Sequence, residues 1–145
     1  MTIQMTAFVA LLLLCGSALA DDASDRAKLL GSWQRQDETG KDVTVWTLEV
    51  KGMALHISES RGDQKISEFE CAPKGAECEG TVEGKKAKIT MYYDGPALVQ
   101  LETQGSEVTR RRFAVGGQPD VMDIEVVPIV GAGKAETLHL KRIKT

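Results

Sequence analysis

The stretch K-K-A-K-I-T-M-Y-Y-D-G-P-A-L-V-Q-L-E-T-Q, residues 85–104, decides the fold class of this chain. Every second residue from Ala87 to Tyr93 is apolar, and a similar alternation resumes from Ala97 to Leu101. Strict alternation of this kind is typical of a strand that buries one face. The Asp94-Gly95 pair between the two runs favours a tight hairpin turn. The stretch therefore predicts two adjacent antiparallel strands.

The same unit recurs along the rest of the chain. From Gly31 onward, glycines occur about every ten residues, which is the turn spacing of an all-β sandwich or barrel. We expect strands at 31–37, 43–50, 53–59, 65–71, 77–82, 86–93, 97–103, 107–115, 121–128 and 136–143. A meander with one apolar face per strand must bury that face against itself, and closing the sheet also removes its exposed edges. We predict an all-β antiparallel up-and-down meander closed into a barrel of about 8–10 strands, with a two-sheet sandwich as the alternative.

The N-terminal segment, residues 1–20, predicts a secretory signal peptide. It has no charged side chain, it contains the apolar run Ala7–Cys15, and it ends in the small-x-small pattern Ala18-Leu19-Ala20. Its removal leaves residues 21–145, which we interpret as a single barrel domain that opens with a short helix at 24–30. We therefore expect an exported protein, either periplasmic or secreted.

The cysteines support the same interpretation. Removal of the signal peptide removes Cys15 and leaves Cys71 and Cys78, which flank a predicted turn. Two cysteines that face each other across a hairpin of an exported chain predict a structural disulfide, although a redox pair is the alternative. A lipid anchor on Cys15 is a further alternative, but the bulky Leu14 before it fits bacterial lipoprotein signals poorly.

Charge and motifs exclude several classes of function. The net charge of −3 is small and mixed along the chain, so we expect no binding to nucleic acid. No second apolar segment is long enough to span a membrane. His56 and His139 fall on predicted polar faces without nearby metal ligands, which indicates no metal site. Nucleophile-elbow, phosphate-loop and dinucleotide motifs are absent from the sequence, so we expect a non-enzymatic protein without a cofactor.

One short motif suggests a family. Leu30-Gly31-Ser32-Trp33 follows the predicted helix and begins the first strand. It resembles the G-x-W motif of the lipocalins and related calycin barrels, and the whole chain is similar to uncharacterised exported lipocalin-like proteins of bacteria. The resemblance implies that Trp33 plugs the closed end of the barrel and that a late basic residue, best matched by Arg142, packs over it. The second lipocalin motif, T-D-Y, is absent, as are the two helices that fatty-acid-binding proteins insert after their first strand.

The run Arg110-Arg111-Arg112 contains the main candidate for ligand binding. Alternation divides the run between two faces, and Arg111 points into the barrel if the face that carries Phe113 is interior. Fatty-acid-binding proteins use interior Arg and Tyr side chains to bind an anionic headgroup, so the resemblance implies this role for Arg111 and Tyr93, with Arg142 as a further candidate. The structural alternatives are an internal ion pair with Glu or Asp, or a guanidinium that reaches solvent at the rim.

The expected function follows from a closed barrel with a possible polar site inside. Trp46 and Phe113 either line a ligand pocket or simply fill the core. We expect non-enzymatic binding of a small apolar or amphipathic ligand inside the barrel. The alternative is an envelope protein-interaction or inhibitor module that acts through its loops and outer surface, with an unknown protein partner. A catalytic role is the third possibility, without a visible constellation to support it.

Overall fold

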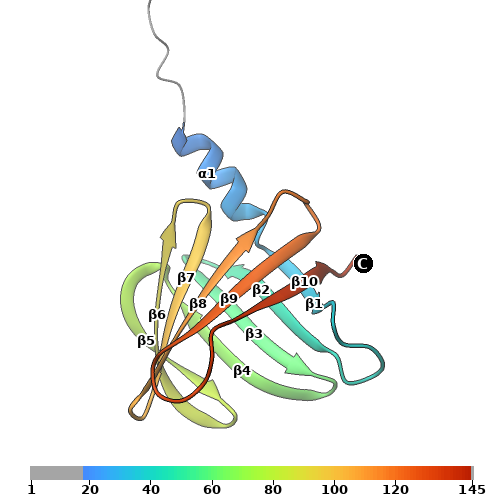
Figure 1. Ribbon diagram of the computed structural model, residues 1–145. Coiled ribbons are helices and arrows are strands. Elements are labelled where there is room, and N and C mark those ends of the chain that lie inside the picture. Colours follow the sequence, from blue (N-terminus) through green and yellow to red (C-terminus); the bar gives the residue numbers. More distant parts are fainter. Residues whose placement is uncertain (1–17, 145) are drawn as a thin grey trace, which may run out of the picture.

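A computed structural model describes residues 18–144, and it forms a closed barrel of antiparallel strands with one helix before it (Figure 1). Each strand pairs with its neighbours in sequence, and the first strand pairs with the last to close the barrel. The elements are α1 (Ala18–Ala27), β1 (Gly31–Arg35), β2 (Thr44–Lys51), β3 (Ala54–Arg61), β4 (Gln64–Cys71), β5 (Lys74–Val82), β6 (Lys85–Asp94), β7 (Ala97–Gln104), β8 (Glu107–Val115), β9 (Val121–Val130) and β10 (Glu136–Arg142). The predicted up-and-down barrel is confirmed, and the sandwich alternative was wrong.

Helix α1 begins and ends earlier than the sequence suggested. We predicted residues 24–30, whereas the observed helix covers Ala18–Ala27. The chain leaves the helix through a tight turn, in which the amides of Leu29 and Leu30 bond to carbonyls three residues back. This exit places the buried Leu29 against the barrel core. Packing against the core therefore ends the helix before Leu29 and Leu30, which we had predicted to be helical.

The predicted signal peptide, residues 1–20, lies almost entirely outside the described residues, which begin at Ala18. Cys15 also lies outside them. Export of the chain therefore stays a prediction from the sequence.

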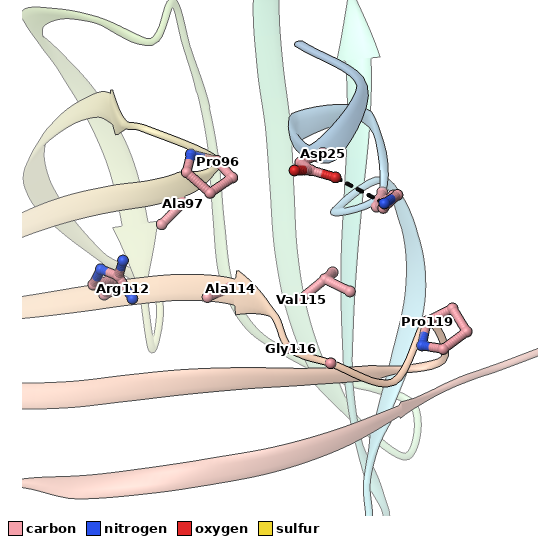
Figure 2. A pocket seen from close by; sticks show the side chains of 10 residues that line it. Asp25, Pro96, Ala97, Arg112, Ala114, Val115, Gly116 and Pro119 are labelled. Atoms are coloured by element: carbon pink, nitrogen blue, oxygen red, sulfur yellow. Dashed lines mark hydrogen bonds and ion pairs between the residues drawn. The ribbon is translucent and has the colours of Figure 1, made fainter. Parts of the chain in front are cut away.

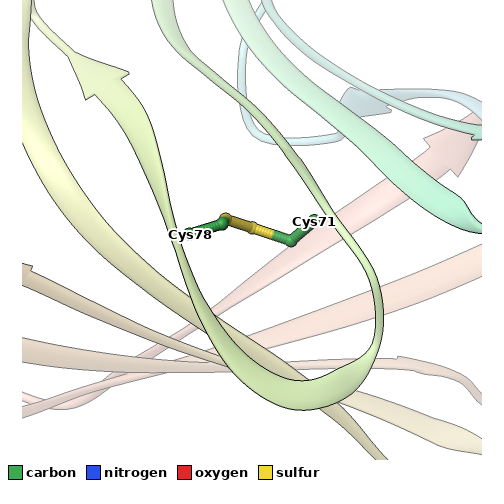
Figure 3. The surroundings of a disulfide bond; sticks show 2 residues. All are labelled: Cys71 and Cys78. Atoms are coloured by element: carbon green, nitrogen blue, oxygen red, sulfur yellow. A yellow bond between two sulfur atoms is a disulfide. The ribbon is translucent and has the colours of Figure 1, made fainter.

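Strands β4 and β5 form the shortest ladder outside β1. Their pairing covers only Ser67–Phe69 against Gly80–Val82, whereas β3 pairs with β4 along almost its full length. Beyond this ladder, a disulfide joins Cys71 to Cys78 across the hairpin, with a Cα–Cα distance of 6.0 Å (Figure 3). The covalent link thus holds the two strands together where the backbone ladder has ended.

The connections between strands alternate between two ends of the barrel (Figure 1). The turns after β2, β4, β6 and β8 lie at the end that α1 reaches, which we call the α1 end, and the other connections lie at the far end. Inward-facing side chains form one apolar core. Its buried members are Leu29, Trp33, Trp46, Leu48, Leu55, Ile57, Phe69, Cys71, Ala87, Ile89, Met91, Leu98, Phe113, Met122, Ile124, Leu138 and Leu140.

Strand β7 turns the face opposite to the predicted one toward the interior. We predicted that the odd-numbered apolar residues of Ala97–Leu101 face inward. The pairing instead places Gln100 directly opposite the core residue Met91, so that Leu98, Gln100 and Glu102 point into the barrel. The sequence assignment of this strand was wrong, and two polar side chains lie inside as a result.

The reason for this error is that β7 is buried on both faces. Ala97 and Val99 are almost inaccessible although they point outward, and Val99 is flanked on neighbouring strands by Tyr92 and Arg112. Because the outer face of β7 is apolar and its inner face is partly polar, the alternation in the sequence indicated the outer face as the one that points into the barrel.

Trp33 and Arg142 close the α1 end of the barrel. Trp33 is fully buried, and its indole Nε1 donates a 2.9 Å hydrogen bond to the carbonyl of Leu29. The guanidinium of Arg142 lies over the indole, 4.2 Å from the ring centroid. Its two terminal nitrogens donate to the carbonyls of Leu30, at 2.8 Å, and Lys28, at 2.7 Å. Arg142 therefore satisfies backbone carbonyls of the turn between α1 and β1.

Gly31 makes this arrangement possible. Its φ of +121° lies in a region that side-chain-bearing residues rarely adopt, and a Cβ at this position would lie 2.8 Å from Nη1 of Arg142. The glycine therefore allows both the turn into β1 and the close approach of the guanidinium to Trp33.

We predict that Arg142→Met destabilises the protein by about 2 kcal/mol, because it removes two charge-assisted hydrogen bonds and a cation–π contact. The measurement is the free energy of unfolding from urea titration. The matched control is Lys141→Met, which changes the exposed, outward-facing neighbour on the same strand. Equal stability of the two variants would contradict a closing role for Arg142.

Candidate functional site

The interior of the barrel is polar toward the far end. Polar side chains there come from two groups of consecutive strands, β2–β4 and β7–β8, and Arg111 of β8 meets Trp46 of β2 across the interior. We define the far-end polar cluster as Trp46, Glu59, Ser67, Gln100, Glu102 and Arg111. Of these residues, Ser67, Gln100 and Glu102 are buried polar groups that the alternation pattern did not place inside.

An ion pair between Arg111 and Glu102 spans strands β7 and β8. Nη1 of Arg111 donates to a carboxylate oxygen of Glu102, and both side chains are largely buried. The guanidinium also lies 6.0 Å from the ring centroid of Trp46. Arg111 therefore points into the barrel, and its charge is matched by a carboxylate of the same chain. This geometry is the internal ion pair that the sequence left open as an alternative to ligand binding.

Gln100 has unmet hydrogen-bonding capacity. Its side chain is fully buried, and neither the amide nitrogen nor the amide oxygen has a hydrogen-bond partner among the described residues. The indole Nε1 of Trp46 is also buried without a hydrogen-bond partner among the described residues. A buried polar group without a partner costs about 1–3 kcal/mol, so such groups in one place need an explanation.

Glu59 adds a second carboxyl to the cluster. It lies opposite Trp46 in the β2–β3 ladder, and Ser67 donates to it at a distance of 3.4 Å. Burial raises the pKa of Glu59, and the positive charge of Arg111 offsets part of this effect. The carboxyl group thus favours its neutral form more than an ordinary glutamate does.

A network of salt bridges lies at the far end of the barrel, where β1 ends. Arg35, at the end of β1, pairs with Asp37 at 2.5 Å and with Glu38 at 3.3 Å. Glu38 in turn accepts hydrogen bonds from the backbone amide and the hydroxyl of Thr44. Hydrogen bonding to Asp37 raises the pKa of Arg35.

The structure separates the candidates that the sequence grouped together. Phe113 lies beside Trp46, with ring centroids 5.6 Å apart in an edge-to-face arrangement, and both are core residues. Tyr93 instead lies toward the α1 end, where Arg26 covers its ring at 4.4 Å and burial raises its phenol pKa. Arg142 belongs to the α1 end as well. Of the proposed headgroup ligands, only Arg111 belongs to the polar cluster.

The pockets in the described part of the chain lie away from the far-end polar cluster. One hollow of about 350 Å³ lies between α1 and the turns at its end of the barrel, with Asp25, Pro96, Arg112 and Val115 in its wall (Figure 2). A wider depression of about 810 Å³ covers the outer surface of β1 and β10. None of the four described pockets is lined by Trp46, Gln100 or Arg111. The far-end polar cluster is therefore enclosed by side chains, which have to move before a ligand can reach it.

Residues 18–144 contain no group of three or more His, Cys, Asp or Glu side chains arranged to hold a metal ion. No helix among them is long and apolar enough to cross a membrane.

Comparison with solved structures shows which proteins share the fold. A fatty acid transporter named REP1-NXSQ is 19% identical with a TM-score of 0.66, and the match covers 82% of this chain and 98% of that one. Fatty-acid-binding protein 1 of Echinococcus granulosus is 9% identical with a TM-score of 0.66, covering 81% and 99%. Secretory abundant heat soluble protein 4 of Ramazzottius varieornatus is 18% identical with a TM-score of 0.65, covering 81% and 96%.

These likenesses show that the chain shares a ten-stranded antiparallel barrel fold with fatty-acid-binding proteins. Two of the structural neighbours are named as a fatty acid transporter and a fatty-acid-binding protein. No protein-family model matches the sequence. No curated protein matches it either.

We predict that Glu59→Gln stabilises the protein near neutral pH. Because the pKa of Glu59 is higher in the folded than in the unfolded state, its favourable contribution is complete below the unfolded pKa, which is about 4.3. That contribution is lost as pH rises through the folded-state pKa. Urea unfolding should therefore show a gain for the variant near pH 7 that shrinks in acid.

Glu68→Gln is the control, and its effect on the free energy of unfolding should have the opposite sign. Hydrogen bonds from Lys65 and His56 lower the pKa of Glu68, so its contribution is present above the unfolded pKa and lost in acid. This variant should lose stability near neutral pH, by a small amount because the group is exposed. If Glu59→Gln also lost stability there, the burial penalty on Glu59 would be refuted.

Proposed function

We propose that this protein binds a small apolar or amphipathic ligand inside its barrel without catalysing a reaction. The observation that carries the proposal is the unpartnered, fully buried amide of Gln100, which lies opposite Arg111 of the Arg111–Glu102 pair in the β7–β8 ladder. A polar group of a ligand would supply the missing hydrogen bonds, while its apolar part would contact the aromatic side chains next to the cluster.

The fold supports the same proposal. The Schistosoma mansoni fatty-acid-binding protein, which was solved in complex with arachidonic acid, shares it at 16% identity with a TM-score of 0.63. At this level of identity the likeness concerns the barrel alone, so the ligand of this chain has to be argued from its own residues. We further propose that the chain is exported, on the basis of residues 1–20.

The alternative function, an interaction module acting through the outer surface, has weaker support. The large exposed apolar side chains of the described residues are divided between two ends of the barrel. Val50 and Met53 flank the β2–β3 turn at the α1 end, whereas Ile129 and Val130 end β9 at the far end. Separate small groups of this kind do not form the contiguous patch that marks a protein interface.

We predict that Gln100→Met raises the free energy of unfolding by about 1–2 kcal/mol, since it replaces an unpartnered buried amide with an apolar side chain of similar shape. The same variant should bind less ligand. The first measurement is urea unfolding of the lipid-free protein, and the second is native mass spectrometry after incubation with a lipid extract. Gln34→Met, on the outward face of β1, is the matched control and should bind as the unmodified chain does.

Two results would contradict the proposal. One is a chain that retains no small molecule from the extract. The other is a Gln100→Met variant that loses stability and binds as well as the unmodified protein, because the amide would then have a structural role only.

A further inference from the structure

The charge balance of the far-end polar cluster limits the kind of ligand that it accepts. The cluster contains one guanidinium, Arg111, and two carboxyl groups, Glu59 and Glu102. The ion pair with Glu102 already matches the positive charge. A ligand carboxylate would be a third acidic group in a region shielded from water, and no cationic side chain of the cluster is free to pair with it.

The charges at the end of β1 act in the same direction. Arg35 is paired with both Asp37 and Glu38, so this group carries more negative than positive charge. Arg35 therefore offers an approaching anion no unpaired positive charge.

The unpartnered atoms of the cluster describe the group that does fit. The Gln100 side chain has two N–H donors and one carbonyl acceptor, and the Trp46 indole adds a donor. A primary carboxamide has the complementary set, because its carbonyl accepts and its N–H groups donate. A hydroxyl offers one donor and can accept as well. A carboxylate accepts only, which would leave the Gln100 oxygen unpartnered.

A cationic head fits less well than a neutral one. Glu59 is a carboxyl without an ionic partner within salt-bridge distance among the described residues. However, the Arg111 guanidinium already occupies the region over the Trp46 ring, 6.0 Å from its centroid, and would repel a second cation. Burial also raises the pKa of Glu59, which reduces the negative charge available to an ammonium group.

We infer that the barrel selects a ligand with a neutral head that both donates and accepts hydrogen bonds, a primary carboxamide or an alcohol, in preference to a carboxylate. This inference rests on the proposed function, since it requires that a ligand occupies the interior. In this inference Gln100 and Trp46 bind the head of the ligand. Glu102 excludes anions, because its ion pair with Arg111 leaves that guanidinium unavailable to a ligand carboxylate.

The test compares four probes that share one alkyl chain: decanamide, decanol, decanoic acid and decylamine. Each is titrated by calorimetry into the lipid-free full chain near neutral pH, and an equimolar mixture is examined by native mass spectrometry. We expect decanamide and decanol to bind at least about tenfold tighter than decanoic acid and decylamine, which corresponds to the cost of one unmet buried polar group.

The failures of the two proposals are distinguishable in this experiment. If decanoic acid or decylamine binds tightest, the head-group inference is overturned while binding inside the barrel stands. If none of the four probes binds, the proposed function fails and the inference fails with it.

Glu102→Gln provides the second arm. The variant removes the ion-pair partner of Arg111, which frees the guanidinium to pair with a ligand carboxylate, so the preference should reverse and decanoic acid should become the tightest probe. The matched control is Glu125→Gln, which removes the partner of Arg110 in an outward-facing ion pair of 3.1 Å and should leave the ranking unchanged. An unchanged ranking in Glu102→Gln would refute the role of Glu102 in excluding anions.

Discussion

The pairing of β1 with β10 is the constraint on which the rest of this structure depends. It converts a meander with two open edges into a barrel, so every strand acquires an inner and an outer face. The register of this pair also places Arg142 opposite Trp33, which brings the C-terminal strand over the exit of α1. Closure of the sheet and closure of the α1 end are therefore produced by the same pair of strands.

Closure also determines which polar groups become buried. Once the register is set, every second residue of each strand faces inward regardless of its polarity. Gln100 and Glu102 lie inside because their neighbours on β6 and β8 do, and burial of Ala97 and Val99 on the outer face stabilises that register. The polar cluster is thus a consequence of the sheet geometry, and Arg111 makes it tolerable by pairing with Glu102.

Most of the fold was predictable because turns and alternation are local properties. X-Gly pairs such as Asp94-Gly95 fixed the hairpins, and the strand ranges agree with the structure to within a few residues. The errors have non-local causes: α1 ends where Leu29 meets the core, and β7 is buried on both faces. For the site, alternation indicated that Arg111 points inward, but its partner Glu102 was assigned to the opposite face. Glu59 and Gln100 carried no signal in the sequence, because only the register of the sheet places Glu59 opposite Trp46 and Gln100 opposite Arg111.

Arg142 and Arg111, two of the inward-facing arginines, show why function is better sought at the far end than at the α1 end. Arg142 donates to two backbone carbonyls and covers Trp33, and it lies 3.5 Å from Asp120, so its bonding capacity is used in closing the barrel. Arg111 has one carboxylate partner, and the amide beside it and the indole beneath it have no partners among the described residues. A buried polar group without a hydrogen-bond partner lowers the stability of the fold. Such groups next to a matched ion pair either bind a further molecule that supplies the missing partner or remain a net cost to stability. Since the unpartnered groups Gln100 and Trp46 Nε1 belong to the far-end polar cluster, this cluster is the part of the interior where a ligand would improve the stability of the protein itself.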